Sequence, residues 1–539
     1  MATAKSSIER RLTRHVPEGR ASQESPRGIP FLTSCRVICL AIPAFLPSLS
    51  FAQSWRLEPS IGTTVTATNN SNLSTAATAS KDIIVDIEPR LIVLGKGANF
   101  SLDGNFGLHR LTYANSTQPN RFLPSGTIAL NANLVDRWFY LDSSVGVEQV
   151  AADPFKVRGN NDSGLNKINT VNYRISPYLQ HGFTPSLSLS IRSDNIWTRR
   201  RGDFAQTDPR RNSTVEKETM VLEQKPLPFG FSLEAAQEKT SYTTGIETLL
   251  QIGSARAVVT YAIDPTFVLG ITGGSEKSEY ALSKSSDKIV GARITWAPTE
   301  RTELRGSVEQ RFFGSGGALQ WSHRSPFIGL YLGVSREPSA LGTSFVLNPN
   351  GGDVQTLLDA IFTTRYPNPA DRATIVKNVI SGLGIPSALG ESVEVFADYA
   401  QLRDTANASI IFQGVRSTLI TRIYAVKSRQ LNQANTPFVP ILGVDADNYQ
   451  KGLSIDFNRR LSPTLSADFG VGYSSIEGLG IVSGQSTTNK AARLGFTQAL
   501  TPKTKLTVGA RYQRTDLVAP GQDISAEEVA GFVGMVHRF

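Results

Sequence analysis

A short turn centred on proline recurs along the chain, and each copy is followed by a segment in which apolar and polar residues alternate. The copies lie at 183–186, 263–266, 296–299, 461–464 and 500–503. Proline fixes φ and lacks an amide donor, so it belongs in a tight reversal and not in a paired central strand. The segments that follow are therefore predicted to be β-strands that begin directly after a reversal.

Alternation in these segments is long and regular. After Pro463, the residues Leu465, Phe469 and Tyr473 fall on one face, and Asp468 falls on the other. Successive side chains of a strand point to opposite faces, so such a strand has one apolar and one polar face. Taken together, the segments predict about 22 strands, within a range of 18 to 22. An even number returns both ends of the sheet to the same side.

Two all-β architectures show this alternation. In a soluble sandwich, which remains the alternative, the apolar face meets a second sheet. Here the strands are many and long, and their polar face is rich in glycine and in both acidic and basic residues. These features favour a membrane barrel with a water-filled lumen. Backbone groups within hydrocarbon must be paired internally, which a sheet achieves only without edges. The predicted fold is an all-β, transmembrane, antiparallel up-and-down β-barrel.

Aromatic residues near the predicted strand ends are expected to form the interfacial girdles of such a barrel. They are Trp55, Trp138, Phe139, Tyr140, Trp197, Trp296, Tyr424 and Tyr512.

The last predicted strand places Met535, His537 and Phe539 on one face. A phenylalanine that closes such a strand resembles the C-terminal signature of bacterial outer-membrane β-barrels, which the barrel-insertion machinery reads. His537 departs from that signature, because an aromatic or aliphatic residue is more usual there. The resemblance implies a bacterial outer-membrane location, with outer-membrane lipid and the insertion machinery as partners. Strand parity then places the N- and C-termini in the periplasm.

The first residues have the pattern of a targeting segment. Residues 1–36 are basic and polar, residues 37–51 are mostly apolar, and the small residue Ala52 follows. We expect residues 1–52 to be a secretory signal peptide and residues 53–539 to form the barrel. Both cysteines, Cys35 and Cys39, lie in the expected signal, so no thiol remains after cleavage. The signal holds seven Lys/Arg and three Asp/Glu, so its removal lowers the formal net charge from +9 to +5. The basic composition therefore gives no reason to expect a nucleic-acid partner.

One region has helical spacing. Val354, Leu357, Leu358, Ile361 and Phe362 recur at helical spacing, and Asn368 with Pro369 can begin a second helix. We predict a helical hairpin inserted at 350–390, in a loop that strand parity places outside the cell. Its apolar stripes either pack on each other and on neighbouring loops, or the hairpin folds over the mouth and restricts the pore.

Charges on the polar faces are candidates for lining the lumen, where mixed signs set what passes. The alternative is that they are structural pairs that hold a wide barrel in shape. The main candidates are Glu303, Arg305, Glu309, Arg311, Asp468, Lys505 and Arg511.

A basic cluster lies on a predicted extracellular loop. Its members are Arg199, Arg200, Arg201, Arg210 and Arg211. Arginines there can pair with lipopolysaccharide phosphates or acidic saccharide. A solvated basic loop without a ligand is the alternative.

Catalytic motifs are missing from the sequence. His109, His181, His323 and His537 lie in separate predicted strands without metal-ligand spacing. No GxSxG, HExxH, P-loop or dinucleotide-binding context occurs. We therefore predict that the protein is not an enzyme and that it has no cofactor and no metal site.

Three segments, 55–61, 134–142 and 357–372, resemble the uncharacterised outer-membrane proteins associated with exosortase/PEP-CTERM systems. Those proteins accompany exopolysaccharide-synthesis loci. The resemblance therefore implies a channel or an export-associated barrel in such an envelope system, with exopolysaccharide or its export proteins as partners. A general diffusion porin and a structural or adhesive barrel without an open pore remain alternatives.

Overall fold

The structure is a computed structural model of the 539-residue chain. It describes residues 54–151, 153, 155–157, 165–201, 212–242, 250–280, 283–339, 358, 361–363, 400–431 and 447–539. The chain divides into two compact units, residues 1–52 and residues 53–539, and every described residue belongs to the second. The predicted signal peptide, with Cys35 and Cys39, lies outside the described residues and stays a prediction.

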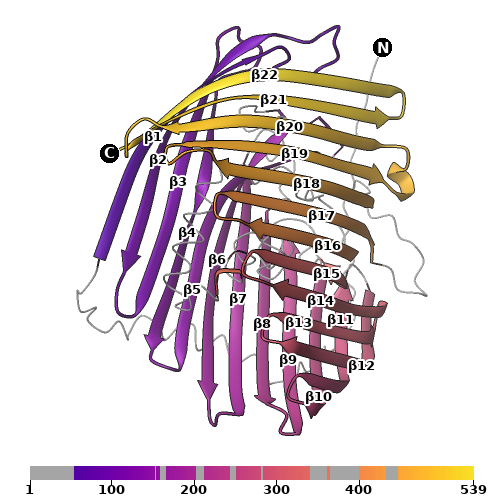
Figure 1. Cartoon of the computed structure of the whole chain (residues 1–539). Helices are drawn as coiled ribbons and strands as arrows, with labels where there is room; N and C mark the ends of the chain where they lie inside the picture. The colour runs from indigo at the N-terminus through magenta and orange to yellow at the C-terminus, as the bar shows by residue number, and fades with distance from the viewer. Residues whose placement is uncertain are drawn as a thin grey trace, which may run out of the picture. The chain divides into compact units, whose positions relative to one another are not determined.

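The second unit is a single antiparallel sheet of 22 strands that closes on itself (Figure 1). Each strand pairs with the next along the chain. Residues 60–68 of the first strand pair with residues 530–538 of the last, which completes the barrel. The predicted all-β barrel of about 22 strands is thus confirmed.

The strands are β1 (Ser54–Thr68), β2 (Asp82–Lys96), β3 (Phe100–Tyr113), β4 (Arg121–Val135), β5 (Phe139–Ala151), β6 (Lys167–Gly182), β7 (Leu187–Arg201), β8 (Ser213–Gln224), β9 (Phe229–Tyr242), β10 (Leu250–Asp264), β11 (Phe267–Tyr280), β12 (Ser283–Thr299), β13 (Thr302–Arg311), β14 (Gly314–Arg324), β15 (Ile328–Ser339), β16 (Gln401–Gln413), β17 (Ser417–Gln430), β18 (Asn448–Arg460), β19 (Leu465–Gly478), β20 (Ser486–Ala499), β21 (Thr504–Ala519) and β22 (Gln522–Arg538). A short 3-10 helix, Gly480–Val482, lies between β19 and β20.

Connections at one end of the barrel have only two to four residues, and we call this the turn end. Four of the five predicted proline turns form reversals here. The fifth, 296–299, instead forms the irregular end of β12, and the chain reverses after it at 300–301. In three of the proline turns a hydroxyl before the proline fixes the reversal. The Oγ atoms of Thr184, Ser462 and Thr501 each accept the backbone N–H three residues later, at 2.9, 3.0 and 2.9 Å. Ser325 does the same at 3.1 Å. A Ser or Thr directly before the proline makes the same hydrogen bond in each of these turns. This recurring residue pair explains why the turns could be recognised in the sequence.

The opposite end, which we call the loop end, carries the longer connections, including 69–81, 202–212, 340–400 and 431–447. Part of it is well built. Asn70, between β1 and β2, donates from Nδ2 to the carbonyls of Ser74 (2.7 Å) and Glu527 (2.9 Å), and it is almost fully buried. Thr68 Oγ1 donates to Glu528 Oε1 at 2.7 Å across the β1–β22 seam. The bonds to Glu527 and Glu528 join the first and last strands where the barrel closes.

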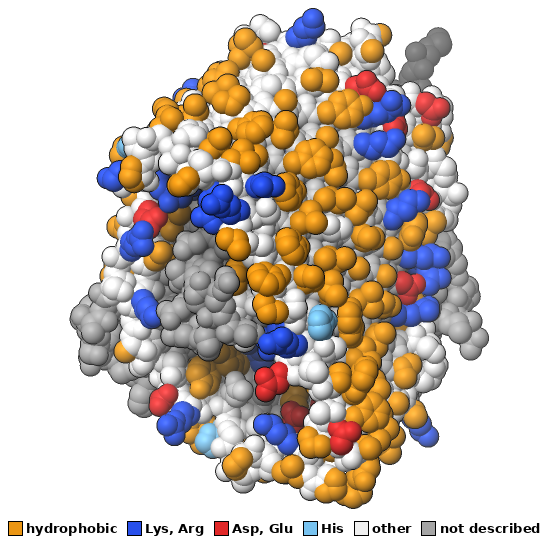
Figure 2. Space-filling view, viewed as in Figure 1, with side chains coloured by type: hydrophobic (Ala, Val, Ile, Leu, Met, Phe, Trp, Pro, Cys, Tyr) orange, Lys and Arg blue, Asp and Glu red, His pale blue; other side chains and the backbone are white. Residues whose placement is uncertain are grey.

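The two faces of the wall differ in chemistry. On β1 the residues Leu57, Ile61 and Val65 point outward and are exposed, while Glu58 and Thr66 alternate with them on the inner face. The same alternation continues around the sheet, and Figure 2 shows hydrophobic side chains spread over the outer wall. A water-soluble sheet buries its apolar face, whereas this barrel exposes it.

Outward aromatic residues gather near the strand ends. At the turn end Trp138 stacks on His181 at 3.6 Å between ring centroids, and Trp321 stacks on His323 at 6.4 Å. Two of the eight residues predicted for the girdles are placed otherwise: Tyr140 and Tyr424 lie on the inner face. One register step decides between the two faces, and adjacent aromatics such as Phe139 and Tyr140 necessarily take opposite ones.

The predicted helical hairpin at 350–390 lies almost entirely outside the described residues. Four of its residues are described: Leu358, Ile361 and Phe362 are in helical conformation and buried, and Thr363 follows in a turn. The hairpin itself stays a prediction. Among the residues that the structure describes, no helix is both long and apolar enough to cross a membrane.

Candidate functional site

The inner face of the barrel carries groups of opposite charges that pair with one another. The pairing is easiest to see on β9–β13, where the Arg293 guanidinium contacts both carboxylate oxygens of Glu234, with Nη2 to Oε2 at 2.8 Å. Arg256 Nη2 lies 3.1 Å from Glu309 Oε2. Both pairs join strands that are three spacings apart, roughly 14 Å along the sheet. Side chains on the concave face of a curved sheet converge, so side chains three strands apart can meet only there. These residues therefore line the lumen.

Small residues make this reach possible. Between the paired strands, β11 presents Gly270, Thr272 and Gly274 inward, and β12 presents Gly291. A Cβ on Gly274 would lie 2.2 Å from the carbonyl oxygen of Ala255, and one on Gly291 would lie 2.4 Å from that of Val308. The inner face of β11 and β12 beneath the charges therefore has only small side chains at these positions.

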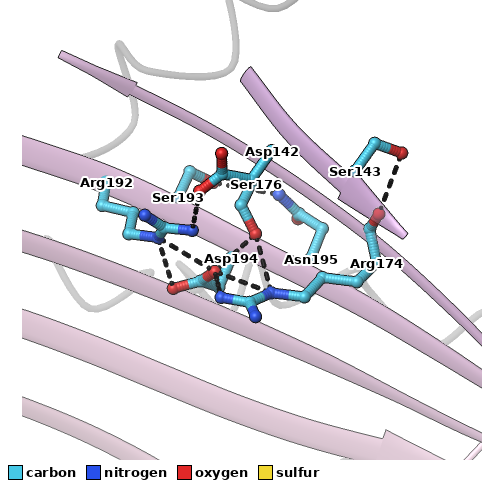
Figure 3. A network of polar contacts seen from close by, with 8 residues as sticks. All are labelled: Asp142, Ser143, Arg174, Ser176, Arg192, Ser193, Asp194 and Asn195. Carbon is cyan, nitrogen blue, oxygen red and sulfur yellow. Dashed lines mark hydrogen bonds and ion pairs between the residues drawn. The ribbon is translucent and has the colours of Figure 1, made fainter. Parts of the chain in front are cut away.

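A second network lies on β5–β7 and is drawn in Figure 3. Its centre is Asp194, which is 6% exposed. Asp194 Oδ1 accepts from Arg174 Nη2 at 2.6 Å and from Arg192 Nε at 3.2 Å, and it also accepts from the Ser176 hydroxyl. Arg192 continues to Asp142, with Nη2 to Oδ2 at 2.8 Å. Two arginines and two aspartates thus balance in charge.

Two tyrosines border this network toward the turn end. Tyr140 and Tyr178 stack with ring centroids 5.0 Å apart and planes inclined by 14°. The Arg192 guanidinium lies over the Tyr178 ring, 4.8 Å from its centroid. Aromatic faces beside paired polar groups form an amphipathic wall that can contact both the C–H and the O–H groups of a polar solute. We call Tyr140, Asp142, Arg174, Tyr178, Arg192 and Asp194 the β5–β7 wall.

The remaining inner pairs continue around the barrel. They are Lys217 with Glu238 (3.6 Å), Glu276 with Arg311 (2.6 Å), Asp468 with Arg493 (2.9 Å) and Glu528 with Arg511 (2.9 Å). On β2–β3, His109 Nδ1 lies 2.8 Å from Asp86, and Arg90 pairs with Glu88. Among the groups named here, this last one is balanced when His109 is protonated and carries one negative charge when His109 is neutral.

The lumen candidates from the sequence all fall on the inner face by strand register. Glu309, Arg311, Asp468 and Arg511 belong to the pairs above. Glu303 and Arg305 pair with each other at 2.7 Å near the turn end, where both are well exposed. Lys505 lies on the inner face of β21, opposite Val536.

The predicted basic loop is placed differently. Arg199, Arg200 and Arg201 are the last residues of β7, so they do not lie in a loop. Arg200 is buried on the inner face, and its N–H donates to Asn212 Oδ1 at 2.9 Å. Three consecutive arginines interrupt the alternation of apolar and polar residues, and this interruption led to the prediction of a loop. The backbone pairing of β7 with β6 nevertheless continues through Arg201, because both faces of the sheet are polar at the end of the strand. Arg210 and Arg211 lie outside the described residues.

The C-terminal signature lies on the outer wall at the turn end. Met535, His537 and Phe539 alternate with inward residues, and Met535 and Phe539 are exposed. The departure at His537 has a structural partner, because its Nδ1 lies 3.0 Å from Thr504 Oγ1 and its ring meets Phe539 edge-on at 5.1 Å. Its reading by insertion machinery stays a prediction.

Sequence reasoning missed most residues of the β5–β7 wall and several charged residues of the network on β9–β13. The missed residues are Asp142, Arg174, Tyr178, Arg192, Asp194, Arg256, Glu276 and Arg293. A signal was present, because Arg192 and Asp194 are spaced by two, as residues of one strand face must be. Among the described residues, no group of three or more His, Cys, Asp or Glu side chains is placed to hold a metal ion.

No protein-family model matches the chain, and no curated protein matches its sequence. Among solved structures, it is similar to the siderophore receptor PiuA from Acinetobacter baumannii, with 8% identity and a TM-score of 0.45, over 89% of this chain and 82% of that one. It is also similar to the outer membrane protein OpdK from Pseudomonas aeruginosa, with 8% identity and a TM-score of 0.33, over 90% and 99%. With TM-scores below 0.5, these similarities carry no information about the function of this chain. The exosortase-associated family stays a resemblance.

Proposed function

We propose that this chain is an outer-membrane channel for uncharged hydrophilic solutes. The observation that carries the proposal is the contrast between the two faces of a closed barrel: exposed apolar residues outside, and charges that neutralise one another inside. An apolar outer band is stable only in hydrocarbon, and in hydrocarbon only a closed sheet satisfies its backbone. A polar inner face is stable only if the lumen holds water.

Barrel size supports a passage. Twenty-two strands spaced about 4.8 Å apart and tilted by about 40° give a cylinder roughly 44 Å across between Cα atoms. Inward side chains fill only part of that width, so a barrel of this size needs a constriction to be selective. We propose that the 350–390 insert provides one, with the loop end outside the cell and the termini in the periplasm.

The chemistry of the lumen supports neutral solutes. Both networks of four charges, on β5–β7 and on β9–β13, are balanced, and the four further pairs are balanced too. Paired charges offer hydrogen bonds to a solute without a strong net electric field. Such a lumen has no strong preference for cations or for anions. The stacked Tyr140 and Tyr178 add an apolar surface for a sugar ring.

A finer proposal follows from the family resemblance. We propose that the solute is a saccharide of an exopolysaccharide/exosortase envelope system, and that the protein acts by transport without catalysis or cofactor. Exopolysaccharide or its export proteins would then be its partners, beside the insertion machinery and outer-membrane lipid. A general diffusion porin and a closed structural or adhesive barrel are the competing functions.

Conductance in planar lipid bilayers tests the coarser proposal. We expect discrete openings, a reversal potential near zero in a KCl gradient, and block by neutral oligosaccharides. Tyr178→Ala should weaken the block, whereas Tyr473→Ala, which removes an outward ring on β19, should not. A barrel that never conducts would favour the structural alternative, and a strong preference for one ion would contradict the balanced lumen.

Two further experiments separate the finer ideas. Deleting residues 350–390 should raise single-channel conductance, and an unchanged value would remove the constriction role. Deleting the gene and measuring secreted polysaccharide tests the export role, which unchanged export would contradict.

A further inference from the structure

The outer wall carries a groove that differs from the rest of the apolar band. It has a volume of about 820 Å³ and crosses the outward face from β11 to β18. Its lining is apolar and mixed: the small residues Ala292, Gly306, Ala406 and Ala425 alternate with larger side chains such as Ile294, Leu319 and Val334. These lie in two adjacent rows of the sheet register, so the groove follows the direction of the backbone hydrogen bonds. Seven strand spacings of about 4.8 Å make it on the order of 34 Å long.

One end of the groove is charged. Arg336 on β15, Asp404 on β16, Lys427 on β17 and Tyr449 on β18 lie side by side in one register row and line the groove. The row belongs to the loop-end half of these strands. Below it on β16 and β17 the outward residues are apolar, with Ile410 and Ile423 exposed. The row therefore lies at the border between the apolar band and a polar rim.

This border has an excess of positive charge. Asp404 is shared by two arginines, with Arg336 Nε at 3.3 Å and Arg429 Nη2 at 3.1 Å. Lys427 forms no ion pair with another residue that the structure describes. Three cations therefore surround one carboxylate. Figure 2 shows basic and acidic side chains along the right-hand edge of the view, beside a broad area of hydrophobic side chains.

An apolar trough that ends in cations matches a molecule with acyl chains and a phosphate. Arginine and lysine are the side chains that bind phosphate, and small residues let an acyl chain lie close to the sheet. Two cations without matching acids suit a phosphate monoester, which carries close to two negative charges at neutral pH. A neutral lipid would leave Lys427 without an anion.

We infer that this groove binds the phosphorylated lipid A part of lipopolysaccharide. One acyl chain lies over Ala425 and Ala406 and continues past Val334 and Leu319 toward Gly306, and one phosphate lies against Lys427 and Arg429. The choice of lipid A over other anionic lipids rests on the proposed function, because only the outer leaflet of the outer membrane meets the loop end in that orientation. This site does not include Arg199–Arg201. Those arginines end β7, and seven strands, β8–β14, separate β7 from the charged row that begins on β15.

Lipid bound to the full chain tests the inference. The protein is purified from membranes in non-ionic detergent, the lipid that stays bound is counted by native mass spectrometry, and the delipidated protein is then titrated with lipid A. The test variant is K427Q/R429Q. The matched control is K490Q/R514Q, which removes the same charge from the same wall outside the groove, on β20 and β21. Migration of unheated samples on gels checks that each variant folds.

We expect one lipid A to stay bound to the wild type, and K427Q/R429Q to weaken binding by at least about tenfold, because two charge-assisted hydrogen bonds are lost. The control should bind like the wild type. Ala425→Trp should block the trough and weaken binding without a change of charge, whereas Ala510→Trp, outward on β21, should not.

Three results would overturn the inference: equal affinity of the two charge variants, equal affinity for lipid A without phosphate, or equal binding of phosphatidylglycerol. Conductance is measured on the same samples. A barrel that binds lipid A but does not conduct would contradict the channel alone, and a conducting barrel without lipid selectivity would contradict the lipid site alone.

Discussion

Replacing Asp194 by asparagine removes one negative charge from the centre of the β5–β7 wall and keeps the shape of the side chain. Asp194 accepts from Arg174 at 2.6 Å, from Arg192 at 3.2 Å and from Ser176. A hydrogen bond to a charged group contributes about 1.5 to 3 kcal/mol, and two guanidinium groups share this carboxylate. Their side chains are 21% and 27% exposed, so water offsets part of the loss. We expect D194N to lower the free energy of unfolding by about 2 to 3 kcal/mol.

Urea unfolding in lipid vesicles, followed by tryptophan fluorescence, measures this change. The control is Glu303→Gln, because Glu303 pairs with Arg305 at 2.7 Å in a region where the side chains are 38% and 66% exposed. An exposed pair contributes about 0 to 1 kcal/mol, so E303Q should unfold nearly like the wild type. The double variant D194N/R174Q restores charge balance and should recover part of the loss.

The same variant alters the lumen. D194N leaves one positive charge unbalanced on the inner wall, so the reversal potential in a KCl gradient should shift toward anion preference. The reasoning fails if D194N and E303Q unfold alike, or if D194N is less stable but its reversal potential does not move. The first result would mean that water already satisfies the two arginines, and the second that this wall does not face the conducting path.

Three further predictions concern the scaffold and use the same unfolding assay. Gly126 has φ +143°, and a Cβ there would lie 2.2 Å from the carbonyl oxygen of Asn105, so G126A should destabilise the barrel by about 1 to 3 kcal/mol, whereas G253A, with no atom within 4 Å, should not. Asn70→Ala removes one donated bond to Glu527 across the β1–β22 seam and two bonds with Ser74 in the loop after β1, and should lose about 2 to 3 kcal/mol, while exposed Asn115→Ala should change stability by less than about 0.5 kcal/mol; equal values would contradict the structural role of Asn70. Ser462→Ala leaves two N–H groups of a proline turn to water and should cost about 0.5 to 1 kcal/mol, and no loss would show that proline alone fixes that turn.

Much of the barrel could be predicted because the deciding information is local. The strand after Pro463 is predicted from its turn and its alternation, and it occurs at Leu465–Gly478. The inner position of Glu309 and Arg311 follows from parity, because a side chain on a strand has only two directions to point. Errors arose where this rule gives no answer, as at Arg199–Arg201, where both faces are polar, and at Tyr140, where aromatic neighbours take opposite faces.

Partners of the inner charges could not be predicted in the same way. Arg293 lies 59 residues from Glu234 along the chain, and Arg256 lies 53 residues from Glu309. Their approach depends on the curvature of the wall and on the small residues of β11 between them. The groove beside Lys427 could not be predicted from sequence either, because its lining comes from eight strands and the alanines and glycines that five of them contribute are not unusual within any single strand.

The sequence by itself determined the strands, the turn-end reversals, the even strand count and the face on which each charged side chain of a well-alternating strand lies, since all of these follow from a period of two and from proline's missing donor. Only the tertiary structure decided which charges neutralise one another, which tyrosines meet inside, and where the outer wall is hollow. Those features depend on how the 22 strands curve and shift relative to one another when the sheet closes. That geometry cannot be derived from the residues of any one strand.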